Sequence, residues 1–162
     1  MTNPARPPFD AVFDSPVGRL AIVLDADRLC GLQFVDGRTA ILPAETVAAR
    51  QIQQAILRYL DVPRELPTVP LAVEGTPFQR RVWAALQAIP AGQVLTYGEL
   101  ARQLRSGARA VGNACRHNPT PLVVPCHRVV PRRGLGGFAG RMSGRLVAVK
   151  RQLLAREGVE IH

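Results

Sequence analysis

A proline-rich stretch, Asp61–Pro70, divides the chain into two unlike halves. It carries three prolines in ten residues. Proline lacks a backbone N–H and its ring clashes with the preceding helical turn, so no helix can continue through this stretch. Runs of β-forming residues precede it, whereas helix-start signals follow it. We therefore predict two domains, residues 1–74 with the linker at their end and residues 75–162.

The first half predicts a small α/β domain, an antiparallel sheet plus one helix. Its apolar and β-branched runs are separated by turn residues such as Asp25 and Asp27, which is typical of short strands. The expected strands lie around Ala11–Asp14, at Leu20–Leu24 and at Leu29–Val35. An amphipathic helix is expected over Glu45–Leu60, because apolar residues recur there every four positions. Its apolar face would consist of Ala48, Ile52, Ile56 and Leu60.

The second half predicts a mostly α-helical domain. Thr76–Gln79 and Thr96–Glu99 are capping boxes, in which side chains at both ends of a four-residue stretch satisfy backbone N–H groups and start a helix. Gly107 then breaks the chain, and Ala108–Arg116 is expected to form the next helix. Two short helices joined by a tight glycine turn are typical of a winged-helix-like helix-turn-helix. A last helix is expected over Ser143–Glu157.

The net positive charge of the chain comes from its second half. The chain has 21 basic and 12 acidic residues, a formal net charge of +9. Residues 1–74 carry seven basic and nine acidic groups, whereas residues 75–162 carry 14 and three. Such asymmetry favours a polyanionic partner such as nucleic acid, although a generally basic, solvated surface has the same composition.

The helix predicted at Ala108–Arg116 has two different faces. Its apolar face would consist of Ala108, Val111 and Cys115. Its outer face combines small residues with guanidinium groups that can reach phosphates or bases: Arg109, Gly112, Asn113 and Arg116. This pattern is compatible with a groove-binding helix and also with plain helical packing.

Composition also indicates the cellular compartment in which the protein is expected. No run approaches the roughly 20 apolar residues that a membrane span needs, and the first ten residues lack the apolar region of a secretory signal. The three cysteines are an odd number, which argues against a disulfide scaffold. We therefore expect a soluble, cytoplasmic protein with no membrane partner, associated with the nucleoid if it binds DNA.

The segment Val123–Pro131, VVPCHRVVP, places Cys126 beside His127. Free cysteine is often a small buried hydrophobe. The flanking prolines disfavour a central strand, however, and predict a short strand, Leu122–Val124, that ends at Pro125. A nearby histidine can lower the pKa of a thiol and supply a reactive thiolate. Spacing alone leaves the buried and the nucleophilic interpretations open.

Zinc is a third interpretation of the same residues. Cys115 and His117 lie close in sequence to Cys126 and His127. Neighbouring side chains on an extended segment point to opposite faces, so Cys126 and His127 would chelate one ion poorly. We therefore expect no metal site.

An ordered set of motifs resembles the O6-alkylguanine-DNA alkyltransferases. The motifs are Thr96–Ala101, Ala108–Gly112, His117–Pro119, Pro125–Val129 with the signature PCHRV, and Lys150 with Leu153–Leu154. They cover Gly75–Gly158, and Phe13–Leu20 is similar to the N-terminal domain of that family. The resemblance implies DNA repair by direct reversal. The protein would move the alkyl group of O6-alkylguanine, and also of O4-alkylthymine, to its own cysteine, once per molecule and without a cofactor.

The resemblance also implies catalytic roles. Cys126 would be the nucleophile, since a soft thiolate suits attack on an sp3 carbon. His127 would act as the base through a water molecule, and Glu157 would orient it in the manner of a catalytic triad. Asn118 would brace the turn before the active site. Tyr97 would crowd the phosphate of the target and donate a proton to the departing guanine.

For a base inside a duplex to react, it must be flipped out. Arg109 would fill the space that the flipped base leaves in the stack. Its helix would bind the minor groove of double-stranded DNA, and the protein would act as a monomer. The residues expected to contact DNA are Tyr97, Ala108, Arg109, Gly112, Asn113 and Arg116.

The substrate pocket is implied in the same way. The carbonyls of Cys126 and Val129 would accept hydrogen bonds from the guanine amino group. Phe138 would form an apolar wall where many members of the family have a tyrosine. Because Arg141–Arg145 is inserted relative to the family, Ser143 is only a candidate for its loop serine.

A non-catalytic class of alkyltransferase-like proteins is the alternative function. These proteins resemble the family but replace the cysteine, commonly with tryptophan, and mark alkylated guanine for another repair pathway. Cys126 is present here, which favours the alkyltransferase.

Overall fold

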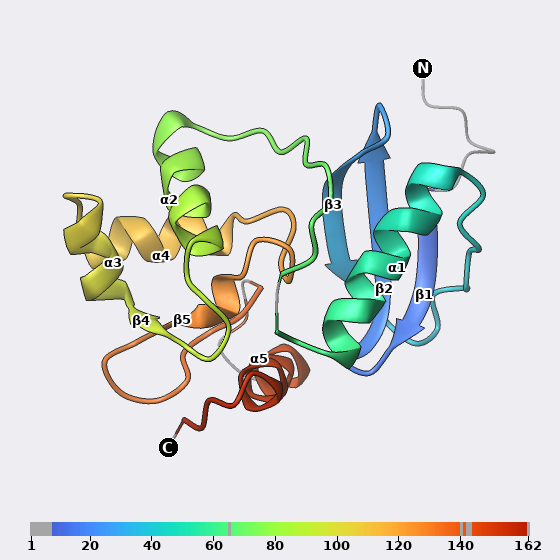
Figure 1. Ribbon diagram of the computed structural model, residues 1–162. Helices are drawn as coiled ribbons and strands as arrows, with labels where there is room; N and C mark the ends of the chain where they lie inside the picture. Colours follow the sequence, from blue (N-terminus) through green and yellow to red (C-terminus); the bar gives the residue numbers. More distant parts are fainter. Residues whose placement is uncertain (1–7, 65, 140, 142–143, 162) are drawn as a thin grey trace.

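In the computed structural model, which describes residues 8–64, 66–139, 141 and 144–161, a sheet with one helix lies beside a group of helices (Figure 1). The sheet contains three antiparallel strands in the order β1-β2-β3, and α1 packs against it. The bounds are β1 Ala11–Ser15, β2 Gly18–Asp25, β3 Arg28–Phe34 and α1 Val47–Asp61. The predicted strands, sheet and helix of the first half are therefore confirmed.

Helix α1 begins two residues after the predicted start. Thr46 is its N-cap, and the Thr46 side chain accepts a hydrogen bond from the backbone N–H of Ala49. Its buried face consists of Ala49, Ile52, Ile56, Tyr59 and Leu60. Ala48 was expected on that face but is only half-buried, because the 3.6-residue turn moves the stripe away from a strict four-residue repeat.

The second half is mostly helical, as predicted. Its elements are α2 Pro77–Gln87, β4 Leu95–Thr96, α3 Tyr97–Gln103, α4 Ala108–Arg116, a 3₁₀ turn at Cys126–Arg128, β5 Val129–Val130 and α5 Arg145–Arg156. Both predicted capping boxes are present, at Thr76 and at Thr96. Strand β4 pairs in parallel with β5, which joins α3 to the segment that follows Cys126.

Helices α3 and α4 pack against each other and are joined by Leu104–Gly107. On α4 the residues Val111, Ala114 and Cys115 are buried, whereas Ala108 is exposed and not part of the apolar face that we expected. At the other end of the chain α5 is followed by Gly158, whose φ of +84° is the left-handed conformation of a helix-ending glycine.

The strand predicted at Leu122–Val124 is wrong. These residues form a turn, in which Leu122 has a φ of +77° and the N–H of Val124 bonds the carbonyl of Thr120. The Asn118 side chain also donates to the carbonyl of Val124 at 2.8 Å and accepts from the N–H of Thr120 at 3.0 Å. Because this local network uses the backbone groups of the segment, no strand partner is needed.

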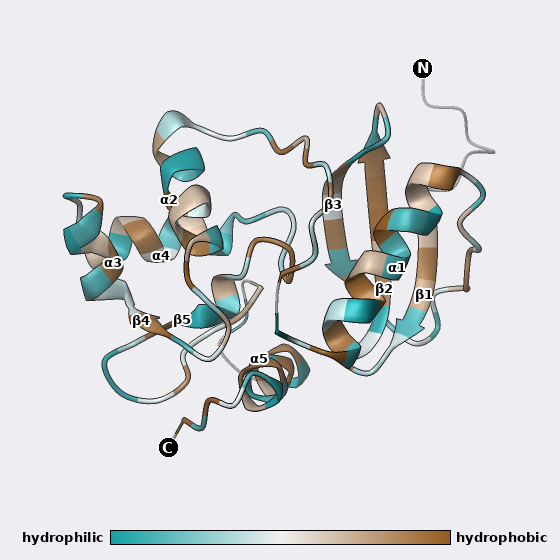
Figure 2. Cartoon of the chain, in the orientation of Figure 1, coloured by the Kyte–Doolittle hydropathy of each residue, from teal (hydrophilic) through white to brown (hydrophobic). Residues whose placement is uncertain are grey.

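The two halves share one hydrophobic core. It runs from the sheet and α1 into α2, α4 and α5, and includes Leu20, Ile22, Leu29, Ile52, Ile56, Leu60, Val82, Leu86, Val111, Val129, Val149 and Leu153. Figure 2 shows the strands as largely hydrophobic and the helices as mixed, as expected for helices that bury one face. The division at residues 74 and 75 stays a prediction. None of the described helices has the length and apolar character of a membrane span.

Candidate active site

Cys126 lies at the floor of a pocket of about 300 Å3. The residue is 6% exposed, so the pocket is the route by which a reagent would reach its thiol. The walls come from α3, α4 and the loop after β5: Tyr97, Gly112, Cys115, Arg116, Pro131, Gly136, Gly137, Phe138, Ala139 and Arg141. The structure thus brings together residues that the sequence placed in separate catalytic, DNA-binding and substrate-pocket groups.

His127 and Glu157 form a buried pair behind the pocket. His127 Nε2 lies 2.6 Å from Glu157 Oε1, and both side chains are fully buried. The carboxylate comes from the C-cap of α5, and the imidazole from the 3₁₀ turn after Pro125. The predicted interaction between these two residues, 30 positions apart, is therefore present in the structure.

Two further side chains complete this buried cluster, and the sequence did not point to either. Arg128 donates from Nε to Glu157 Oε2 at 2.8 Å and from Nη1 to the carbonyl of Ile89 at 2.5 Å. The hydroxyl of Tyr59, on α1, donates to Glu157 Oε1 at 2.7 Å and lies 3.2 Å from His127 Nε2. Arg128 could have been suspected because it follows His127 directly. No local pattern marks Tyr59.

The charges of the cluster follow from burial and from these bonds. Burial alone would raise the pKa of the Glu157 carboxyl, but hydrogen bonds from His127, Arg128 and Tyr59 together lower it to about 2. Burial lowers the pKa of His127, and this outweighs the opposing effect of Glu157. At neutral pH the contact is therefore a hydrogen bond from a neutral imidazole to a carboxylate.

This protonation state leaves one imidazole nitrogen available. With its proton on Nε2, facing Glu157, the ring carries a lone pair on Nδ1. Among the described residues, Nδ1 has no hydrogen-bond partner although it is buried. A buried, unpaired acceptor next to a nucleophile in the sequence is what a general base requires.

The thiol of Cys126 is protonated at rest. Burial raises its pKa, although a hydrogen bond from the Asn118 side chain and the charge of Lys150 act in the opposite direction. Lys150 is itself buried, and burial lowers its pKa to about 8. The thiol therefore needs a base to become a strong nucleophile.

The loop after β5 forms the far wall of the pocket. Lys150 Nζ donates to the carbonyl of Val129 at 2.8 Å and to that of Gly137 at 3.0 Å, which ties the loop to α5. Gly136 has a φ of +74°, and a Cβ there would lie 2.6 Å from Pro131 Cδ, so the loop requires glycine at this position. Val129, which we expected in the substrate pocket, is fully buried and is not among the residues that line it, and its carbonyl accepts from Lys150.

Phe138 is buried and packs edge to face against two other rings. Its ring meets that of Phe34, from β3, edge to face at a centroid distance of 5.5 Å, and that of His127 at 6.5 Å. Phe138 thus adds an apolar ring to the pocket lining, and Phe34 of the N-terminal half packs against it; its role toward a substrate stays a prediction. Ser143 lies outside the described residues.

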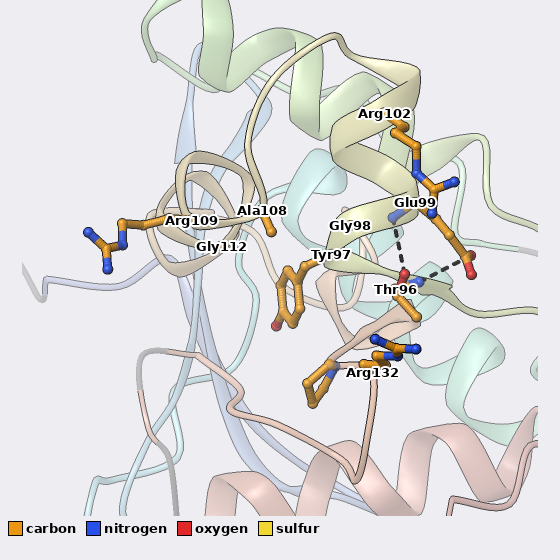
Figure 3. Close-up of a pocket in the computed structure, with 10 residues that line it drawn as sticks. Thr96, Tyr97, Gly98, Glu99, Arg102, Ala108, Arg109, Gly112 and Arg132 are labelled. Carbon is orange, nitrogen blue, oxygen red and sulfur yellow. Dashed lines mark hydrogen bonds between the residues drawn. The ribbon is translucent and has the colours of Figure 1, made fainter.

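A wider groove of about 890 Å3 opens beside the pocket. It runs between the N-terminal turn of α3, the outer face of α4 and Pro131–Arg132 (Figure 3). Tyr97, Gly112 and Pro131 line both the groove and the pocket, so they mark the place where the two meet. Burial raises the pKa of the Tyr97 phenol, which keeps the hydroxyl protonated and able to donate.

The predicted DNA-contacting residues lie on this groove or next to it. Ala108, Arg109 and Gly112 line the groove, and Arg109 extends away from Tyr97 toward solvent (Figure 3). Asn113 and Arg116 are exposed on the same helix. A Cβ at Gly112 would lie 3.9 Å from the Tyr97 ring, so a larger side chain would narrow the passage between groove and pocket.

Comparisons with known proteins agree on one family. The family model described as "6-O-methylguanine DNA methyltransferase, DNA binding domain" matches residues 77–159. A methylated-DNA–protein-cysteine methyltransferase of Methanosarcina acetivorans is 37% identical over 156 residues, which cover 91% of this chain and 97% of the relative. The crystal structure of Mycobacterium tuberculosis O6-methylguanine methyltransferase has a TM-score of 0.74 at 34% identity and 90% coverage of both chains. The structure of the Mycobacterium tuberculosis OGT in complex with DNA has a TM-score of 0.73 at 36% identity, again with 90% coverage of both chains.

Proposed function

The chain belongs to the O6-methylguanine-DNA methyltransferase family, the methylated-DNA–protein-cysteine methyltransferases, and we propose that Cys126 is its methyl acceptor. The protein repairs DNA by moving a methyl group from the damaged DNA to its own cysteine. The observation that carries this assignment is the position of Cys126 at the floor of a pocket, directly before the His127–Glu157 pair. Cys115 lines the same pocket, but the residue that follows it is Arg116 and not a histidine.

The reaction requires a proton to leave Cys126 before the carbon is transferred. His127 takes it at Nδ1, through a bridging water, and Glu157 stabilises the imidazolium that results. The thiolate then attacks the alkyl carbon, a C–S bond forms, and the C–O bond to guanine O6 breaks with its electron pair moving to the guanine. Tyr97, protonated and at the mouth of the pocket, donates a proton to the departing base.

The product explains why each molecule reacts once. A thioether at Cys126 does not hydrolyse, and the mechanism contains no second nucleophile to remove the alkyl group. The substrate is O6-alkylguanine: Phe138 gives the pocket an apolar wall for the ring, and the backbone carbonyls of Cys126 and Val129 would accept from the amino group. The Val129 carbonyl keeps a second lone pair beside the one bonded to Lys150.

DNA is the partner of the groove. The excess of 14 basic over three acidic residues in positions 75–162 supplies the phosphate-binding charge. The target base enters the pocket past Tyr97 after rotation out of the duplex, and Arg109 takes its place in the stack. Helix α4 binds in the minor groove, and the protein acts as a monomer.

The alternative, a non-catalytic lesion-binding protein, is not favoured. Cys126 is present, and the Methanosarcina relative is named for the transfer reaction. The test is the position of the methyl group after incubation with a duplex that contains O6-methylguanine. Peptide mass mapping should find it on Cys126 and not on Cys115 or Cys30, which serve as internal controls. Methyl found on Cys115 would reject the assignment of the nucleophile.

The variant Arg109→Ala should slow transfer from duplex DNA by about 10- to 100-fold and leave the fold intact. Arg109 is exposed, so its side chain is not part of the core. A flipped base costs a few kcal/mol, which this side chain would offset. The measurement is the single-turnover rate of transfer on duplex and on single-stranded DNA, where flipping is not needed.

A matched control separates this role from loss of charge. Arg50→Ala removes an exposed arginine of α1, outside the groove, and should transfer at the parent rate. Equal rates for Arg109→Ala and the parent on duplex DNA would contradict the role given to Arg109. So would an equal loss on duplex and on single-stranded DNA.

A further inference from the structure

Tyr59 is the one member of the buried catalytic cluster that comes from the N-terminal half. It lies on the inner face of α1, 3% exposed, and its hydroxyl reaches 68 positions along the chain to His127 and 98 positions to Glu157. A tyrosine whose only task was packing would not need a hydroxyl at this depth, where an unpaired one is costly. The hydroxyl is instead bonded to the two groups on which proton transfer depends.

The geometry around His127 Nε2 sets the tautomer of the imidazole. The single hydroxyl hydrogen of Tyr59 is donated to Glu157 Oε1, so the Tyr59 oxygen can act toward Nε2 only as an acceptor. Glu157 Oε1, 2.6 Å from Nε2, is an acceptor as well. Both neighbours of Nε2 therefore require a hydrogen on that nitrogen, and this leaves the lone pair on Nδ1.

We propose that Tyr59 is a positioning residue of the alkyl-transfer site: its hydroxyl fixes His127 with the proton on Nε2 and tempers the basicity of Glu157, so that Nδ1 is free to accept the proton of Cys126. This inference rests on the proposed function of His127 as the base. It gives the N-terminal half a part in the chemistry beyond support of the fold. Tyr59 does not touch the substrate, since it lies behind the pocket and lines neither the pocket nor the groove.

Other charged groups around His127 limit the effect that loss of the Tyr59 hydroxyl can have on the imidazole. Glu157 and Lys150 face it from α5, and Arg128 and Cys126 flank it in the chain. Arg128 stays bonded to Glu157 Oε2 when the hydroxyl is removed, because its donor uses the other carboxylate oxygen at the shorter distance. Loss of the hydroxyl therefore makes Oε1 a stronger acceptor from His127 without freeing the carboxylate.

The test is Tyr59→Phe in the full-length protein, with Ile56→Val as the matched control. Ile56 is a fully buried residue one turn away on the same face of α1, and the substitution removes one methyl group without touching a polar atom. The first measurement is the rate at which iodoacetamide alkylates Cys126 without DNA, as a function of pH. The second is the single-turnover rate of methyl transfer from a duplex that contains O6-methylguanine.

Tyr59→Phe should lower the methyl-transfer rate at neutral pH by about tenfold. This is part of the rate enhancement that a well-positioned general base provides. The substitution should also move the acid limb of the iodoacetamide profile to higher pH, because a more basic Glu157 makes His127 easier to protonate. Ile56→Val should leave the midpoint of the iodoacetamide pH profile unchanged. Its transfer rate should fall only in proportion to any decrease in the fraction of folded protein.

A profile for Tyr59→Phe with the midpoint of the parent would overturn the proposal, whatever the loss of rate, because a merely structural tyrosine lowers rates without moving a titration. The two measurements also separate the inference from the function on which it rests. If the parent protein took no methyl group from the duplex, the proposed function would fail. A shifted iodoacetamide midpoint would still establish the link between Tyr59, His127 and Cys126.

Discussion

The variant Cys126→Ala should lose methyl transfer completely and keep its affinity for DNA. The Cys126 thiol supplies the sulfur of the stable C–S bond, and replacing it removes the nucleophile rather than weakening it. Cys126 is buried and lines the pocket but not the groove, so binding should be unchanged. The measurements are methyl transfer by mass spectrometry and affinity for a duplex with O6-methylguanine.

Cys115→Ala is the matched control for this result. Cys115 lines the same pocket, is buried to a similar degree, and raises the same question of thiol reactivity. Because the proposed base, His127, directly follows Cys126 and not Cys115, loss of the Cys115 thiol should leave one equivalent of transfer. Transfer by Cys126→Ala at any measurable rate, or loss of transfer in Cys115→Ala alone, would contradict the assignment.

The variant Glu157→Gln should be both slower and less stable. The carboxylate pairs with the buried guanidinium of Arg128 and accepts from His127 and Tyr59. Neutralising it leaves Arg128 as an uncompensated buried charge, which costs about 3 kcal/mol of unfolding free energy. Transfer should fall by about 100-fold, since the imidazolium of His127 is no longer stabilised. Urea unfolding and single-turnover kinetics measure the two effects.

The pH dependence of the unfolding free energy provides a second test of Glu157. The pKa of Glu157 is lowered from 4.5 to about 2 on folding, so the carboxylate contributes stability above pH 4.5 that is lost as the pH falls toward 2. Glu157→Gln should therefore show a shallower loss of stability over that range than the parent protein. Parallel curves for parent and variant would show that Glu157 is not the strongly bonded carboxylate described above.

Local signals predicted the fold well. The capping boxes at Thr76 and Thr96 start α2 and α3 at the expected residues, because their hydrogen bonds involve only four neighbouring residues. The turn at Leu122–Val124 was missed for a related reason. There the Asn118 side chain, outside the segment, makes hydrogen bonds with backbone groups that a strand would have paired. The β-branched residues of the segment give no sign of these hydrogen bonds.

The catalytic site was only partly visible in the sequence. Cys126 and His127 are adjacent and Glu157 follows at the end of a helix, so motif order brings them together. Tyr59 and Phe34 reach the site from the N-terminal half across the shared core, and their contacts depend on how α1 and β3 pack against the second half. A pattern of buried positions identifies such residues as core, and cannot say that one of them ends in a hydroxyl beside a catalytic base.

Intact-protein mass spectrometry after incubation with an O6-methylguanine duplex tests the central claim most directly. The protein should gain the mass of one methyl group in place of one hydrogen, stop at one equivalent however much duplex is added, and gain nothing from a duplex with unmodified guanine. Binding of the methylated duplex by full-length protein with no gain of mass would contradict the claim, and would identify the protein as a lesion-binding relative that does not transfer the methyl group.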